Sequence, residues 1–348
     1  MKSGRVSIAL ATYNGARFLG EQLDSLGRQE ILPHELVVVD DGSTDDTLRV
    51  VRSFARKAPF PVNIYSNDEN LGYGETFMKA ASLCEGEWIA FCDQDDVWMP
   101  EKIRRIKAII EKNPALNVVV HDAFVCDAEL HPRRSLLMKS RQHNFFRERQ
   151  LSAAQCTFRI YFGCCTVVKR AFLLDIPPDM RPKLRSGPEV GRLVPHDIWV
   201  FILGDIYGSV YLSPLPLLLY RRHKNTTTGH TKKKIRRQLA EVRKGSSNDY
   251  RRLGIFYTSL AEGLCQVAAS VNVRQSVSMI LDSTHRYEQA ADWSLQRALL
   301  YEATSLWKRL GMLVKLWNSG CYFGTDRMKG FGARALVKDF LRVWLGGS

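Results

Sequence analysis

Short apolar runs rich in β-branched residues alternate with amphipathic stretches through the first third of this 348-residue sequence. The apolar runs predict strands, at Val6 to Leu10, Leu36 to Val39, Val62 to Tyr65 and Trp88 to Phe91. The amphipathic stretches predict helices, at Phe18 to Leu26, Thr44 to Phe54, Thr76 to Leu83 and Ile103 to Ile110. Such alternation is typical of βαβ units. We therefore expect an α/β fold, in which helices cover both faces of a mainly parallel sheet.

The regular alternation ends near residue 130. A basic, polar stretch from Leu130 to Gln150 predicts a loop or flap, and prolines and glycines between residues 177 and 195 exclude a long helix there. Strand-like runs return at Val210 to Leu212 and Leu217 to Tyr220. From about Lys232 to Arg309 the apolar spacing is helical. The sequence thus predicts an α/β region up to about residue 230 and a helical region after it.

The net charge of +14 favours an anionic partner, which could be nucleic acid, an acidic membrane surface or a phosphorylated substrate. Many basic residues crowd into the second half of the chain, at Lys232, Lys233, Lys234, Arg236, Arg237, Arg243, Lys244, Arg251 and Arg252. A nucleic-acid-binding protein would show a recognition fold, an aromatic RNA-binding strand or zinc-like spacing, and none is recognisable here. We therefore expect no nucleic-acid partner.

The eight cysteines show no CxxC pair and no zinc-like spacing, so they are expected to be reduced residues of the core. No run of about 18 uncharged apolar residues is present, and no leader pattern precedes the first predicted strand. These features predict a protein that stays in the cytoplasm.

Polar residues follow three of the predicted strands, in the segments Ala11 to Gly15, Asp40 to Ser43 and Asp93 to Asp96. In an open α/β sheet, ligands bind beyond the carboxyl ends of the strands. Carboxylates that converge there repel one another unless a cation neutralises them. Mg²⁺ or Mn²⁺ fits such a site, because both ions prefer oxygen ligands. The alternative for a single Asp is a turn or helix cap, which is how Asp45 and Asp46 are interpreted.

Five segments carry a resemblance to a known family. They are VSIALATYNGARFLGEQLDSLGRQ (Val6 to Gln29), ELVVVDDGSTDDT (Glu35 to Thr47), NLGYGETFMKAASLCEGEWIAFCDQDDVWMPEKI (Asn70 to Ile103), PHDIW (Pro195 to Trp199) and YRRHKNTTTG (Tyr220 to Gly229). In this order, over roughly residues 5 to 230, they resemble bacterial family 2 glycosyltransferases of the GT-A fold. The DQDDVW version most resembles the branch of rhamnosyltransferases and related makers of surface polysaccharide. Between Leu130 and Pro195 only the surroundings of Gly163 match clearly, so the resemblance leaves the acceptor open.

The resemblance implies a nucleotide-sugar pocket and a metal site at the matching positions. The pocket residues would be Ala11, Tyr13, Asn14, Asp41, Asn70, Gly72 and Lys79, with Asp41 facing the base or the ribose. Asp93 and Asp95 match the family's DxD element, with Asp95 the more direct metal ligand. Arg221, Arg222 and His223 could reach the diphosphate, with Arg222 preferred, or His223 could complete the metal shell. A solvated turn is the alternative for all three.

Asp197 matches the position of the family's general base. On the acceptor side, His196 could orient the acceptor, Trp199 could form a sugar-stacking wall, and Asp96 would lie alongside. The alternatives are structural: His196 could be a cap or a packed residue, and Trp199 could belong to the core.

The activity that the resemblance implies is an inverting, metal-dependent hexosyl transfer from a nucleoside-diphosphate sugar to a hydroxyl of a polyprenyl-linked glycan. Rhamnose from dTDP-rhamnose is the preferred donor. Residues 1–230 would form the catalytic domain, with a nucleotide-sugar half up to about residue 125 and an acceptor half from 126 to 230. Two alternatives remain: a non-catalytic nucleotide-binding scaffold of a polysaccharide assembly complex, and a nucleotidyltransferase, whose Gly-rich N-terminal loop with Arg and Lys is absent here.

Residues 231–348 are predicted to be helical and basic. The last segment, Met328 to Trp344, combines apolar residues (Phe331, Leu336, Phe340, Leu341, Val343 and Trp344) with basic ones (Arg327, Lys329, Arg334, Lys338 and Arg342). A basic amphipathic helix with Trp and Phe on its apolar face suits an anionic membrane interface. The alternative is packing on the catalytic domain. With membrane contact, the protein would be peripheral on the inner face of the cytoplasmic membrane.

Overall fold

The computed structural model describes residues 4–136, 148–153, 162–185, 190–223, 247–270, 274–325 and 330–345. Contacts between residues divide the chain into two compact units. The α/β unit comprises Met1–Pro178 and Pro195–Thr226, and the helical unit comprises Asp179–Val194 and Thr227–Ser348. The sequence placed a division near residue 230 and gave no sign that Asp179–Val194 groups with the helices.

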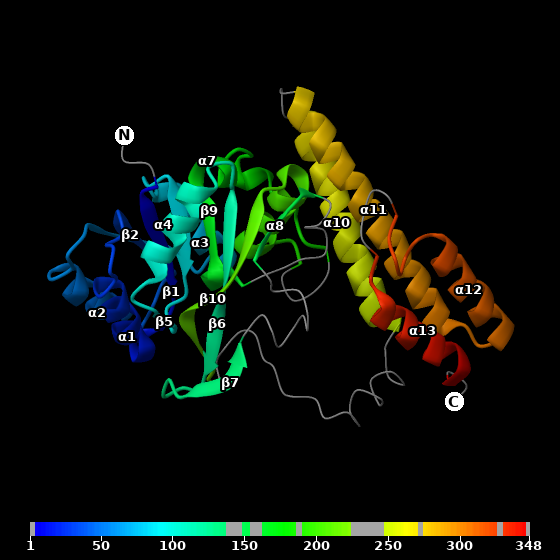
Figure 1. Ribbon diagram of the computed structural model, residues 1–348, viewed down its shortest axis with the longest axis horizontal. Coiled ribbons are helices and arrows are strands. Elements are labelled where there is room, and N and C mark those ends of the chain that lie inside the picture. Colours follow the sequence, from blue (N-terminus) through cyan, green and yellow to red (C-terminus); the bar gives the residue numbers. More distant parts are fainter. Residues whose placement is uncertain are drawn as a thin grey trace. The chain divides into compact units, whose positions relative to one another are not determined.

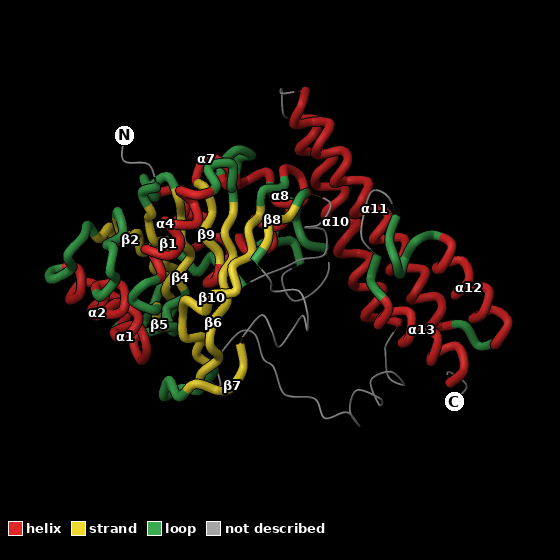
Figure 2. The backbone as a smooth tube through the Cα atoms, in the orientation of Figure 1, coloured by secondary structure: helices red, strands yellow, loops and turns green. Residues whose placement is uncertain are grey.

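The α/β unit is built on one mixed, mainly parallel sheet (Figure 2). The described strands are β1 (Val6–Thr12), β2 (Glu35–Asp40), β3 (Val62–Ser66), β4 (Trp88–Cys92), β5 (Val97–Trp98), β6 (Val118–Cys126), β7 (Pro132–Leu136), β8 (Arg149–Leu151), β9 (Thr166–Lys169) and β10 (Val210–Arg221). Their order is β3-β2-β1-β4-β9-β6-β10-β5, with β7 beside β6 and β8 beside β10. The pairs among β3, β2, β1 and β4 are parallel, as is β6 with β10, whereas β9 runs antiparallel to both of its neighbours.

Helices flank this sheet, as predicted (Figure 1). They are α1 (Ala16–Gly27), α2 (Thr47–Ala55), α3 (Tyr73–Leu83), α4 (Lys102–Lys112), α7 (Arg170–Leu173) and α8 (His196–Tyr207). The helices α1 and α2 pack against each other, whereas α3 packs on β1 and β2 and meets α8. Every residue of β2 and of β4 is buried, which confirms the prediction of strands covered on both faces.

The prediction of a loop from Leu130 to Gln150 is wrong at its two ends, which form β7 and the start of β8. The strand β7 pairs with a part of β6 that β9 does not cover. Strand β9 pairs with β6 at Val118 to Val120, and β7 pairs with the same strand farther on, at Phe124 and Cys126. Backbone groups of β6 beyond the end of β9 need hydrogen-bond partners, and β7 supplies them. Residues 137–147 lie outside the described residues.

The described part of the helical unit contains the helices α10 (Ser247–Ser270), α11 (Arg274–Glu302), α12 (Leu306–Asn318) and α13 (Ala333–Leu345). The helices α10 and α11 pack along each other. The predicted helical stretch breaks before α12, where the Ser305 hydroxyl accepts a hydrogen bond from the backbone N–H of Lys308 at 3.2 Å. The predicted start at Lys232 lies outside the described residues. None of the described helices combines the length and the apolar character that crossing a membrane requires.

A buried carboxylate, Asp339, attaches α13 to the rest of the helical unit. It accepts two hydrogen bonds from the guanidinium of Arg297 in α11, at 2.6 and 2.8 Å. The hydroxyls of Tyr301 and Tyr322 donate to it as well, at 3.1 and 2.9 Å. Val343, one helical turn farther on, is also buried. One face of α13 therefore packs within the helical unit.

Replacing Asp339 with Ala should destabilise the helical unit by about 3–5 kcal/mol, because the buried Arg297 would lose its counter-charge. Urea unfolding followed by tryptophan fluorescence measures this loss. Asp292→Asn is the matched control, since Asp292 is an exposed carboxylate on α11, and it should change stability by less than about 0.5 kcal/mol. Equal stabilities of the two variants would contradict a structural role for the Asp339 network.

Candidate active site

The side chain of Gln94 joins the loops that follow β1 and β4. Its amide nitrogen donates to the carbonyl of Tyr13 at 3.0 Å, and its amide oxygen accepts from the N–H of Tyr13 at 2.9 Å. A Cβ atom at Gly15 would clash with this amide group, so a larger residue there would displace the Gln94 side chain. Sequence reasoning gave Gln94 no role, although it lies between the two predicted metal ligands. Tyr13, the residue that follows β1, is 48% exposed. Ala11 lies near the end of the same strand and is partly buried.

Asn14 joins the same loop to the one after β2. Its φ angle of 46° lies in the left-handed region, which Asn tolerates better than most residues. Its N–H donates to the Ser43 hydroxyl, and its side-chain oxygen accepts from the N–H of Thr44, both at 2.9 Å. The predicted pocket residues Tyr13 and Asn14 therefore lie where the loops after β1, β2 and β4 meet.

Asp41 organises the loop that precedes α3. It is buried, and its carboxylate accepts from the N–H groups of Leu71 and Gly72 at 2.8 and 2.9 Å. Gly72 has a φ angle of 85°, which a residue with a side chain rarely adopts. The side chain of Asn70 donates to the carbonyl of Asp41 at 3.1 Å. Three predicted pocket residues thus form one wall, and contact of Asp41 with the base or ribose stays a prediction.

Asn67, which sequence reasoning missed, links Lys79 to this wall. Its amide nitrogen donates to the Asp41 carboxylate at 2.7 Å, and its amide oxygen accepts from the Lys79 ammonium at 2.8 Å. The structure therefore brings Lys79 into the same network as Asp41.

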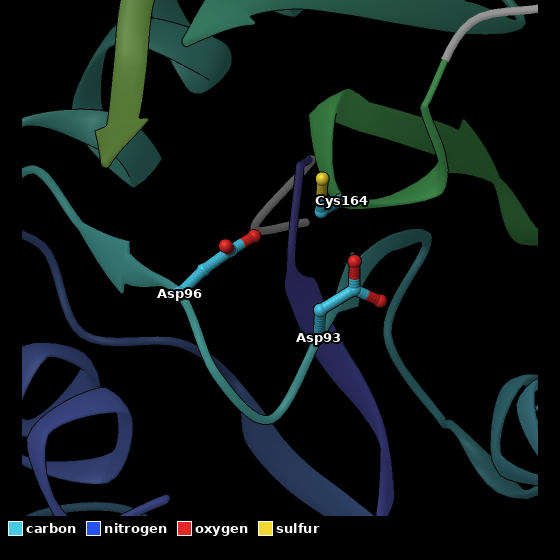
Figure 3. Close-up of side chains that lie close together, drawn as sticks. All are labelled: Asp93, Asp96 and Cys164. Carbon is cyan, nitrogen blue, oxygen red and sulfur yellow. The ribbon is translucent and has the colours of Figure 1, made fainter. Parts of the chain in front are cut away.

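The predicted metal ligands fall into two groups. His223 Nε2 lies 2.7 Å from Asp95 Oδ2, and both side chains are largely buried. Asp93 is grouped instead with Asp96 and Cys164, whose ligand atoms all lie within 4.8 Å of one another (Figure 3). Cys164 belongs to a short 3₁₀ turn, Gly163–Cys165. The sequence around Cys164 did not predict that it lies beside Asp93 and Asp96.

Electrostatic strain is concentrated at this edge of the sheet. Burial and the neighbouring carboxylates Asp95 and Asp197 raise the pKa of Asp93 to about 7, although the Cys164 thiol opposes the shift. Burial, followed by Asp95 and Asp93, raises the pKa of Asp96 well above its usual range. The raised pKa values of Asp93 and Asp96 show that the site destabilises the charged forms of these carboxylates.

Lys102 supplies one buried positive charge near these carboxylates. Its ammonium donates to the carbonyl of Cys164 at 3.1 Å and lies 3.6 Å from the centre of the Trp98 ring. Burial lowers the pKa of Lys102 to about 8, whereas nearby thiols and Asp96 favour its charged form. Lys102 therefore holds the Cys164 turn against the acidic cluster.

Arg221, the last residue of β10, supplies the second buried positive charge. Its guanidinium donates to the carbonyl of Asp95 at 2.7 Å, and also contacts the carbonyl of Ala128 and the carboxylate of Glu21. Its backbone N–H donates to Asp96 Oδ1 at 3.0 Å. Arg221 thus fixes the backbone of the predicted DxD element. Sequence reasoning preferred Arg222, whose side chain is only partly buried and whose contact with a diphosphate stays a prediction.

Asp197 lies in the first turn of α8 and accepts from the N–H of Ile198 at 2.8 Å. Its charge raises the pKa of Asp93, so the predicted base and the DxD element lie at the same site. The ring of His196 is buried, with centroids 4.2 and 4.6 Å from those of Phe77 and Phe91. A Cβ atom at Gly163 would lie 2.4 Å from His196 Nε2. The structure therefore favours the packing role for His196, which anchors the start of α8.

The acceptor-side roles of Asp96 and Trp199 are corrected. Both side chains are 0% exposed, so neither offers a surface to an acceptor sugar. Trp199 packs in the core as one of its largest buried side chains, the alternative that the sequence left open. Asp96 supports the site from beneath through Arg221 and the acidic cluster.

The residue types at this edge suit a hard divalent cation, although they stand in two groups. Asp95 and His223 offer an oxygen and a nitrogen in one group, and Asp93 offers an oxygen in the other. Burial and neighbouring carboxylates raise the pKa of Asp93, which a bound cation would counteract. Asp95 and His223 already contact each other. Mg²⁺ or Mn²⁺ at these residues stays a prediction.

Comparison with known proteins agrees with the fold. Residues 7–176, a little under half of the chain, match the model of glycosyl transferase family 2. This segment is therefore similar to family 2 glycosyltransferases. An uncharacterized glycosyltransferase of Nostoc sp. is 33% identical over 117 residues, which are 34% of this chain and 36% of that protein. The chain thus spans about a third of the length of that relative.

Two further proteins extend the comparison. A dTDP-rhamnosyl transferase of Shigella flexneri is 26% identical over 230 residues, 63% of this chain and 73% of that protein. The crystal structure of S. aureus TarS residues 1–349 in complex with UDP-GlcNAc has a TM-score of 0.54 and 18% identity, covering 92% of this chain and 94% of that one. The latter likeness supports the fold.

Metal binding at this site should depend on pH near neutrality. Asp93 must lose its proton before it binds a cation, and its pKa is about 7 without metal. The affinity for Mn²⁺ should therefore fall about tenfold per pH unit below that pKa and level off above it. Calorimetric titration in buffers of different ionisation enthalpy measures both the affinity and the released proton.

Asp93→Asn should bind Mn²⁺ more weakly and with a smaller dependence on pH near 7, because one of the groups that must lose a proton has been removed. Asp24→Asn, which alters an exposed carboxylate of α1, should behave like the unaltered protein. A steep dependence that persists in Asp93→Asn would assign the proton to another group.

Proposed function

We propose that this protein is a family 2 glycosyltransferase, which transfers a sugar, with inversion, from a nucleoside-diphosphate donor to an acceptor hydroxyl. The observation that carries the proposal is the convergence of Asp197 with Asp93 at the strand ends where Asp95 meets His223. A donor bound there would have its diphosphate at the metal site and its sugar toward Asp197.

Asp197 is proposed as the general base. A carboxylate opposite the leaving group can remove the proton of the attacking hydroxyl as the bond to the sugar forms. The position of Asp197 at the start of α8 is held by the packing of His196 against Phe77 and Phe91. Such rigid support is what a catalytic carboxylate requires for orientation.

Asp95, Asp93 and His223 are proposed to hold Mg²⁺ or Mn²⁺, which when bound would neutralise the charge of the departing diphosphate. Arg221 keeps the backbone of Asp95 in place. On the nucleotide side, the wall formed by Asp41, Asn70 and Gly72, with Lys79 behind it, is proposed to receive the nucleoside, together with Ala11, Tyr13 and Asn14.

Rhamnose from dTDP-rhamnose is the proposed donor, and a hydroxyl of a polyprenyl-linked glycan is the proposed acceptor. The donor proposal draws on the DQDDVW segment and on the likeness to the dTDP-rhamnosyl transferase of Shigella flexneri. We further propose that the protein works peripherally on the inner face of the cytoplasmic membrane. A non-catalytic nucleotide-binding scaffold would bind the same donor and release no nucleoside diphosphate.

Asp197→Asn should separate binding from turnover. The carboxamide keeps the shape of the side chain but accepts no proton, so transfer should fall by about 10²- to 10⁴-fold while donor affinity stays nearly unchanged. Release of nucleoside diphosphate measures turnover, and calorimetry with the donor measures affinity. Asp175→Asn is the control, because Asp175 bonds the hydroxyl of Tyr207 at the other end of α8.

A variant Asp197→Asn that loses donor affinity would move Asp197 into the diphosphate site. One that transfers sugar at the normal rate would assign the base to another residue. Absence of nucleoside diphosphate release by the unaltered protein would favour the scaffold.

A further inference from the structure

Large apolar side chains are exposed on both C-terminal helices of the helical unit. On α12 and the turn after it, Trp307 is 81% exposed and Phe323 is 63% exposed, and Val314 and Trp317 are more than half exposed. On α13, half or more of each of three side chains is exposed, namely Val337, Phe340 and Trp344. We call these seven residues the α12–α13 surface.

Helical spacing places these side chains in rows. Val337, Phe340 and Trp344 recur at intervals of three and four, so they share one face of α13, away from the buried Asp339 and Val343. On α12, the interval from Trp307 to Val314 is seven residues, which is close to two full turns. The buried residues of α12, Arg309 and Leu316, lie on another face. Each helix therefore packs by one face and presents an apolar row to solvent.

The charge of this segment indicates which partner covers it. Residues 306–345 contain eight Lys and Arg and two Asp, a net charge of +6. Asp339 is already neutralised by Arg297, and Lys308, Lys315 and Arg334 are exposed. A second copy of the chain would bring these exposed cations close to one another, which is unfavourable. An anionic lipid surface attracts the Lys and Arg and accepts Trp and Phe at the level of its headgroups.

We propose that the α12–α13 surface docks on an anionic lipid bilayer, with its aromatic side chains in the headgroup region. The surface differs from the one that the sequence predicted, which included only Met328 to Trp344. In the structure, Arg342 donates to the carbonyl of Tyr301, and the Lys338 ammonium lies 5.4 Å from the ring centre of Tyr250. Two cations of α13 thus turn inward, and α12 contributes the exposed lysines.

Docking on lipid would account for the peripheral membrane location proposed above, but it does not depend on the proposed transfer of sugar. One consequence of docking rests on the proposed function: the bilayer would bring the catalytic domain to a lipid-linked acceptor. The experiment therefore measures lipid binding and nucleotide binding separately on the full chain, so that either proposal can fail alone.

Cosedimentation with vesicles of phosphatidylglycerol or of phosphatidylcholine tests the surface. The unaltered protein should bind the former at least about tenfold more tightly than the latter, and high salt should weaken the binding. The triple variants Trp307→Ser/Trp317→Ser/Phe323→Ser and Val337→Ser/Phe340→Ser/Trp344→Ser should each lose about tenfold or more of the affinity. Lys308→Gln/Lys315→Gln should lower the affinity for phosphatidylglycerol and its dependence on salt.

The matched control is Ile255→Ser/Leu299→Ser, which removes exposed apolar side chains from α10 and α11 of the same unit and should leave lipid binding unchanged. Circular dichroism and binding of nucleoside diphosphate establish that each variant is folded. Equal sedimentation of the triple variants and the control would overturn the proposal. A dimer that the triple variants abolish, without vesicle binding by the unaltered protein, would overturn it in favour of a second copy.

Discussion

Repulsion among carboxylates at one edge of the sheet is the constraint on which the site depends. Asp93 lies beside the buried Asp96, and burial together with the charges of Asp95 and Asp197 raises the pKa of Asp93. Two buried cations lie near these carboxylates. Lys102 donates to the carbonyl of Cys164, and Arg221 donates to the carbonyls of Asp95 and Ala128 and pairs with Glu21. They fix the backbone around the carboxylates, and the charge of Lys102 offsets only part of the rise in the pKa of Asp93. A divalent cation together with a diphosphate would relieve the remaining repulsion, which is why the edge suits a nucleotide-sugar donor.

The first half of the sheet was predictable because its signals are local. The strand from Val6, the helix beginning near Phe18 and their successors alternate with a period that backbone geometry dictates. The order of the later strands was not predictable in the same way. Strand β9 lies between β4 and β6, and β7 completes the free edge of β6, so these pairings depend on contacts between distant segments. The C-terminal helices were predictable as helices, but not the Asp339 network that decides which face of α13 is buried.

The sequence could place those site residues that directly follow a predicted strand or begin a predicted helix. Asp41, Asp95 and Asp197 are of this kind. The positions of the other site residues depend on which side chains are buried. Arg221 and Arg222 are adjacent, and successive side chains of a strand point to opposite sides, so only one of the two could enter the core. The sequence offered no basis for choosing. Asn67 and Gln94 act through hydrogen bonds to Asp41 and Tyr13, which lie 26 and 81 positions away in the chain. Cys164 reaches Asp93 and Asp96 through a turn that only the fold assembles. Trp199 is apolar enough for either a sugar wall or the core, and full burial supports the core.

The central claim is that this edge binds a nucleoside diphosphate and a divalent cation together. Thermal unfolding with a panel of nucleoside diphosphates, each measured with Mn²⁺ and with a chelator, tests it most directly. A ligand at about 100 times its dissociation constant stabilises the folded state by about 2.7 kcal/mol. The account predicts that at least one diphosphate, with dTDP the first candidate, raises the unfolding temperature in Mn²⁺ and that chelation removes the gain. Equal shifts with and without the metal, or no shift with any nucleoside diphosphate, would contradict it.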